Sequence, residues 1–108
     1  MKLNAASTER FKKILAVLGE KDYIKIDNSD GVFMPLVVER LSKNVFSLSH
    51  YGEMNGDLMA NPDMTFLVEG DDITPLSFQD DYMGIYTKKC DLAFCDLWLK
   101  NIEDQQRL

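Results

Sequence analysis

Apolar residues recur with two different spacings along this chain, and the change of spacing predicts where helices and strands lie. Near the N-terminus a stripe follows the 3–4 residue spacing of one buried helix face, and it consists of Phe11, Ile14, Leu15 and Leu18. The stripe predicts a helix over residues 8–18. Ser7 or Thr8 would cap its free amides, and Gly19 suits the position just past its end.

In the middle of the chain the spacing changes to alternation of apolar and polar residues, which is typical of half-buried strands. The pattern predicts about five strands, over residues 23–27, 35–42, 45–51, 64–69 and 73–79. It leaves open a further short strand at residues 85–87. Lys43-Asn44 has the length and chemistry of a tight hairpin turn, so the second and third strands should be neighbours.

Helical spacing returns at residues 91–106, where Leu92, Cys95, Trp98, Leu99 and Ile102 gather on one side. Asp91 precedes them as a cap. A helix, an antiparallel sheet of about five strands and a second helix predict one α+β domain over residues 1–108. Helices on one face of such a sheet leave its other face for water or a partner.

Composition and charge narrow the classes of function. The chain has 108 residues, 45% of them hydrophobic, and a net charge of −6. Residues 1–50 carry a net charge of +2 and residues 51–108 a net charge of −8. An acidic half repels phosphate backbones, so we expect no direct contact with nucleic acid. No apolar run is long enough for a membrane span, so we expect a cytoplasmic protein without membrane contact.

Residues 50–64, HYGEMNGDLMANPDM, combine a titratable histidine, carboxylates and two turn dipeptides, Asn55-Gly56 and Asn61-Pro62. We call this segment the signature loop, and its polar members are His50, Glu53, Asn55, Gly56, Asp57 and Asp63. Two interpretations stay open at this stage. The carboxylates, with Asp80 and Asp81, could hold Mg²⁺ or Ca²⁺ beside His50. Equally, the dipeptides could be ordinary turns and His50 a structural residue at a strand end.

The remaining reactive side chains point to no particular chemistry. Cys90 and Cys95 lie five residues apart on a helical pattern, and we expect buried, reduced thiols. One histidine is too few for a typical zinc site, and the chain has no phosphate-binding glycine loop. We therefore expect no cofactor and no resident metal.

Three segments stand out: the signature loop, PLSFQDDYMG at residues 75–84 and WLKNI at residues 98–102. Together they resemble a family of small uncharacterised bacterial domains that are often carried by phages, plasmids and conjugative elements. The resemblance covers residues 35–103 and leaves the first helix outside. It implies a mobile-element setting and a shared loop, but no catalytic role for any residue.

Two functions therefore compete. We favour a non-enzymatic interaction protein of a mobile element, for example an inhibitor of CRISPR or restriction defence. It would bind a basic nucleic-acid-binding protein or nuclease. Its contact surface would be an acidic patch with aromatic anchors: Tyr51, Glu69, Asp71, Asp72, Asp80, Asp81 and Tyr82. The alternative is a metal-dependent hydrolase built on His50 and the clustered carboxylates. Oligomeric state is left open by the sequence.

Overall fold

The computed structural model describes the backbone of residues 1–108 and every side chain except those of Glu53 and Met54. The elements are α1 (Ala5–Leu18), β1 (Tyr23–Ile26), β2 (Leu36–Ser42), β3 (Val45–Met54), β4 (Asp57–Glu69), β5 (Asp72–Asp80), β6 (Ile85–Thr87) and α2 (Leu92–Gln105). The predicted α+β class is confirmed. The sheet has six strands instead of about five, because residues 85–87 pair with the end of β5.

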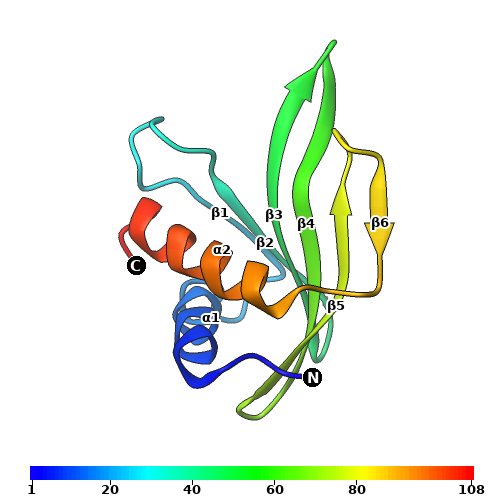
Figure 1. Cartoon of the computed structure of the whole chain (residues 1–108). Coiled ribbons are helices and arrows are strands. Elements are labelled where there is room, and N and C mark those ends of the chain that lie inside the picture. Colours follow the sequence, from blue (N-terminus) through cyan, green and yellow to red (C-terminus); the bar gives the residue numbers. More distant parts are fainter.

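The six strands form one antiparallel sheet in which each strand pairs with its neighbour in the chain, in the order β1 to β6 (Figure 1). Lys43-Asn44 joins β2 to β3, as predicted. Cross-strand partners share a face of the sheet. Val38, Leu48 and Met64 thus follow one another on one face, while Val37, Ser49 and Asp63 follow one another on the opposite face.

The two helices begin at capping side chains. Asn4, and neither Ser7 nor Thr8, caps α1, because its side chain accepts a hydrogen bond from the Ser7 amide at 2.8 Å. The helix therefore starts one turn earlier than predicted, with Ser7 and Thr8 buried in its first turns. Asp91 caps α2 as predicted and accepts from the amides of Ala93 and Phe94. No helix in the described chain is long and apolar enough to cross a membrane.

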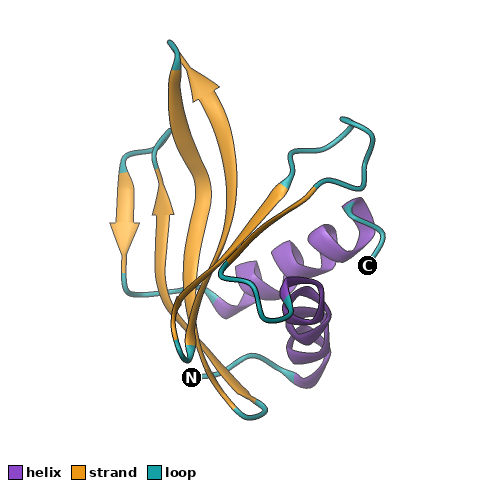
Figure 2. Cartoon of the chain, turned by 180° about the vertical axis from the view of Figure 1, so that it is seen from behind, coloured by secondary structure: helices purple, strands orange, loops and turns teal.

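Both helices lie against the same face of the sheet, which we call the covered face (Figure 1). The core forms there from Phe11, Ile14, Leu18, Leu36, Val38, Phe46, Leu48, Met64, Phe66, Ile73, Cys95, Trp98, Leu99 and Ile102. Phe11 of α1 meets Phe66 of β4 edge to face, with ring centroids 4.9 Å apart. Figure 2 shows the sheet from behind. Neither α1 nor α2 covers the face seen there, which we call the open face.

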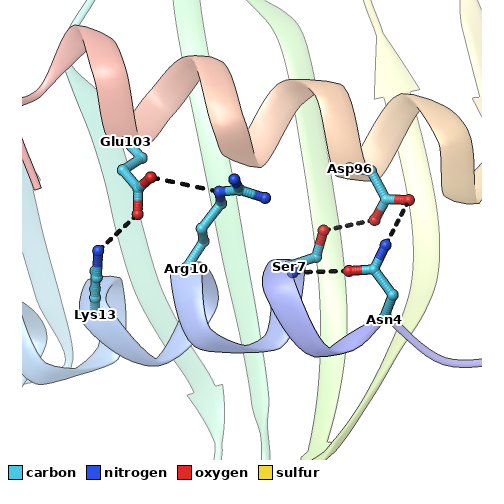
Figure 3. Close-up of polar contacts among 6 residues, drawn as sticks. All are labelled: Asn4, Ser7, Arg10, Lys13, Asp96 and Glu103. Carbon is cyan, nitrogen blue, oxygen red and sulfur yellow. Dashed lines mark hydrogen bonds and ion pairs between the residues drawn. The ribbon is translucent and has the colours of Figure 1, made fainter.

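A polar seam joins the two helices to each other, as Figure 3 shows. The two carboxylates of the seam come from α2. The Asp96 carboxylate accepts from Ser7 Oγ at 2.5 Å and from Asn4 Nδ2 at 3.1 Å. About two turns further along α2, Glu103 accepts from Arg10 Nε at 3.4 Å and from Lys13 Nζ at 2.7 Å. The seam therefore fixes how the helices lie over the sheet.

Candidate functional site

The signature loop is a β-hairpin and not a loop. Residues 50–64 form the end of β3 and the first half of β4, which extend beyond the helices (Figure 1). The predicted turn at Asn55-Gly56 is confirmed, since both residues have positive φ (51° and 85°), as a tight hairpin turn requires. The second predicted turn is wrong, because Asn61 and Pro62 lie within β4. A register shift at this point leaves Asn61 and Pro62 as extra residues of β4, a bulge opposite His50 of β3.

His50 is buried on the covered face, at the end of the core-facing row of β3 as predicted. Its Nδ1 accepts a hydrogen bond from Trp98 Nε1 at 3.3 Å, and the two rings meet edge to face. This bond places the proton of the neutral ring on Nε2, which has no partner among the described residues. Burial lowers the pKa of His50. The geometry is that of a neutral histidine packed under α2.

The five acids of the predicted contact surface lie at the two ends of β5. Glu69, Asp71 and Asp72 surround the β4–β5 turn, while Asp80 and Asp81 follow the other end of β5. At about 3.3 Å per residue the two groups are roughly 26 Å apart. They do not form one continuous patch, because most of β5 lies between them.

Most of these acids already have contacts within the protein. Asp71 forms an ion pair with Lys12, and Asp72 forms one with Lys2 at 2.8 Å. The Asp80 side chain is buried and accepts from the Met83 amide at 3.2 Å, which holds the turn after β5.

Tyr82 lies in that same turn and packs over Gly52 of β3. A Cβ at residue 52 would collide with the Tyr82 hydroxyl, so any larger residue there would push the tyrosine ring aside. Although Tyr82 is 39% exposed, the end of its ring lies against the backbone of Gly52 in the hairpin. Tyr82 is therefore a structural contact as well as a predicted anchor.

On the open face, by contrast, the structure brings together Tyr51, Asp63 and Asp81. Asp63 lies in the middle of the sheet, opposite Ser49 of β3 and Gln79 of β5. Tyr51 Oη donates to Asp63 Oδ2 over a long 3.5 Å. The other oxygen, Oδ1, is buried and finds no donor in the described part of the chain.

Electrostatics at this cluster differ between its two carboxyl groups. Burial raises the pKa of Asp63, and the charge of Asp81 raises it further, against smaller opposite effects of the Ser49 and Tyr51 hydroxyls. The pKa of Asp81 is lowered, because its carboxylate accepts from Gln79 Nε2 at 2.8 Å and from the Ala60 amide at 2.7 Å. Asp81 is thus a satisfied anion, and Asp63 beside it is an anion short of donors.

An open groove of about 290 Å³ adjoins this cluster on the same face. Its lining combines two tyrosines, three apolar residues and two opposite charges: Tyr23, Tyr51, Pro35, Val37, Leu58, Lys25 and Glu39. Ser49, next to Tyr51 on the same face, is fully buried, and its Oγ makes no hydrogen bond of normal geometry to a described residue. Tyr51 therefore belongs both to the groove and to the carboxyl cluster.

Most of the groove was missed by sequence reasoning. Its residues come from β1, β2, β3 and β4 and, for Pro35, from the residue just before β2, so their proximity depends on strand order and not on local spacing. Alternation in β1 is the one signal available, because it places Tyr23 and Lys25 opposite the core residues Ile24 and Ile26.

The residues of the metal hypothesis point to different sides of the molecule. His50 lies on the covered face and Asp63 on the open face. Among the side chains that the structure describes, no three His, Cys, Asp or Glu residues stand close enough to hold a metal ion. The Glu53 side chain lies outside the described part. Asp57 is exposed at the hairpin tip.

Both cysteines are free and buried, as predicted. Burial is the main cause that raises the pKa of Cys95 to about 12, so its thiol stays protonated at neutral pH.

Residues 7–108 match a family described as "Domain of unknown function (DUF6908)". The expected membership of an uncharacterised domain family is confirmed in this form. Neither a curated protein nor a solved structure matches the chain.

Proposed function

We propose that this chain, which belongs to the DUF6908 family of domains of unknown function, is a non-enzymatic interaction protein. It would bind a basic segment of a partner protein. The contact lies on the open face at the hairpin end, around Asp63, Asp81 and Tyr51. One observation carries the proposal: Asp63 is half-buried on an uncovered face, and its Oδ1 has no donor among the described groups.

A cationic side chain is the group that Asp63 lacks. A carboxylate that is partly removed from water without enough donors destabilises the folded protein. A Lys or Arg side chain of a partner would supply donors and opposite charge together. Asp81 adds a second negative charge that is already fixed in place by Gln79 and the Ala60 amide.

The net charge of −6 supports the same partner class, because an acidic surface attracts basic proteins and speeds their encounter. We propose a nuclease or another nucleic-acid-binding protein as the partner. The resemblance of the hairpin segment to domains of mobile elements further suggests a phage or plasmid protein that inhibits a defence such as CRISPR immunity or restriction. Compared with the sequence-based hypothesis, the contact moves from five scattered acids to Asp63 and Asp81.

Affinity capture from a host-cell lysate tests this proposal with two charge-matched variants. Asp63→Asn removes the proposed contact, while Asp72→Asn removes an equal charge at the far end of β5. We expect a basic protein to bind the wild type and Asp72→Asn, to be lost with Asp63→Asn, and to elute as salt is raised. Partners that bind Asp63→Asn as well as the wild type would contradict the proposal.

A further inference from the structure

The groove beside Asp63 indicates which side chain the basic segment contributes. We propose that the groove receives one arginine side chain of an extended segment, with its guanidinium on Asp63 and its plane against Tyr51. This inference rests on the proposed function and specifies its ligand.

Tyr51 connects the two halves of this site. Its hydroxyl reaches Asp63 Oδ2, and its ring lines the groove together with Tyr23 and Val37. The proposed side chain lies along the groove with its stem on Val37 and Leu58, and its end passes Tyr51 to reach the Asp63 carboxylate, which lies just outside the groove lining. The volume of about 290 Å³ is at the lower limit of small-molecule pockets, which suits a single long side chain.

The lining favours guanidinium over ammonium. A guanidinium is planar, weakly hydrated and able to stack on an aromatic ring, whereas an ammonium keeps a tight water shell. Its several N–H donors suit the Asp63 carboxylate, whose Oδ2 has only a long contact with the Tyr51 hydroxyl. The remaining charges of the lining, Lys25 and Glu39, are opposite in sign, so the attraction comes from Asp63 and Asp81.

The strand geometry favours an extended segment as the carrier of this arginine. The open face between β1 and β4 is a pleated surface whose flanking side chains, Tyr23 and Leu58, are 55% and 74% exposed. Such exposed flanks give an extended backbone apolar surface to cover on each side of the anchored side chain.

Amide NMR titration of the full chain with three capped tripeptides tests the inference. The peptides are Ac-Gly-Arg-Gly-NH₂, its lysine analogue, and its citrulline analogue, which keeps the shape of arginine without the charge. We expect the arginine peptide to shift the amides of Val37, Tyr51 and Asp63, with an affinity at least tenfold above that of the other two. Equal affinity for arginine and lysine, or no shift at these amides, would overturn the inference.

A pair of tyrosine variants checks the role of stacking. Tyr51→Leu should reduce the preference for arginine over lysine at least fivefold. Tyr86→Leu changes an exposed tyrosine at the far edge of the sheet and should leave the preference unchanged. If both variants keep the preference, stacking on Tyr51 is excluded.

Octalysine separates a failure of this inference from a failure of the proposed function. If octalysine shifts amides around Asp63 and Asp81 but the arginine peptide shows no preference, the groove inference fails while basic-segment binding stands. If neither probe shifts those amides, both fail.

Discussion

The polar seam between the helices and the open face of the sheet treat carboxylates in opposite ways. In the seam, each oxygen of Asp96 and Glu103 accepts a hydrogen bond from α1 (or, for one Asp96 oxygen, from its cap Asn4) (Figure 3). On the open face, Asp63 has one long contact with Tyr51 and a buried oxygen without a donor from the described residues. Carboxylates that join α1 to α2 therefore accept hydrogen bonds on both oxygens, whereas Asp63 does not.

The pKa directions repeat this contrast. Hydrogen bonding by Lys13 is the main cause that lowers the pKa of Glu103, whereas burial raises that of Asp63. A raised carboxyl pKa means that the folded protein disfavours the charge. Carboxylates kept under such conditions concentrate at functional sites, where stability is given up for binding or catalysis. The seam carboxylates are thus stabilised by contacts within the chain, and Asp63 is the carboxylate that we propose as the binding group.

The largest difference between the two faces of the sheet is expected at neighbouring residues of β4. Phe66 is fully buried on the covered face, while Thr65 faces the open side. Phe66→Ala should lower the free energy of unfolding by about 3–5 kcal/mol because it leaves a cavity beside Phe11. Thr65→Ala should change it by less than about 1 kcal/mol. Urea denaturation measures both, and similar losses would mean that the open face is also part of the core.

A smaller loss is expected in the seam. Asp96→Asn turns one acceptor into a donor that faces Ser7 or Asn4, and should lower the free energy of unfolding by about 1–2 kcal/mol. Asp104→Asn makes the same change at an exposed position of α2 and serves as the control. If Asp96→Asn is as stable as the control, the seam does not hold the helices together.

Low pH should reduce the free energy of unfolding through His50, which is buried on the covered face. Burial lowers its pKa in the folded protein, so the unfolded chain binds more protons once the pH falls below about 6.5. Stability should then fall with decreasing pH, by up to about 1.4 kcal/mol per pH unit until the folded pKa is reached. His50→Phe should lose this slope between pH 6.5 and the folded pKa. An unchanged slope in the variant would exclude His50 as its cause.

Local patterns were enough for the helices, most strands, the Asn55-Gly56 turn and the inward position of His50. They failed where pairing across the sheet overrides local preference, as at Asn61-Pro62, which would make a turn in isolation but lies within a long strand. The Asn4 cap was missed because Ser7 and Thr8 are equally good capping residues by type.

The candidate site was predicted only in part. Tyr51, Asp63 and Asp81 were singled out from the sequence, but in separate groups and for different reasons. Their proximity depends on the order of β3, β4 and β5, and the missing donor at Asp63 depends on burial. Neither property has a local sequence signal.

The most direct test of the contrast between seam and open face is the free energy of unfolding of Asp63→Asn at neutral pH, measured beside Asp96→Asn. We expect Asp63→Asn to be more stable than the wild type by about 0.5–1 kcal/mol, a modest gain because solvent screens part of the charge. The folded pKa of Asp63 is raised, so the penalty exists only while Asp63 is ionised, and the gain should shrink as pH falls through that pKa. A loss of stability equal to that of Asp96→Asn would show that Asp63 is a structural carboxylate and would contradict its assignment as the binding group.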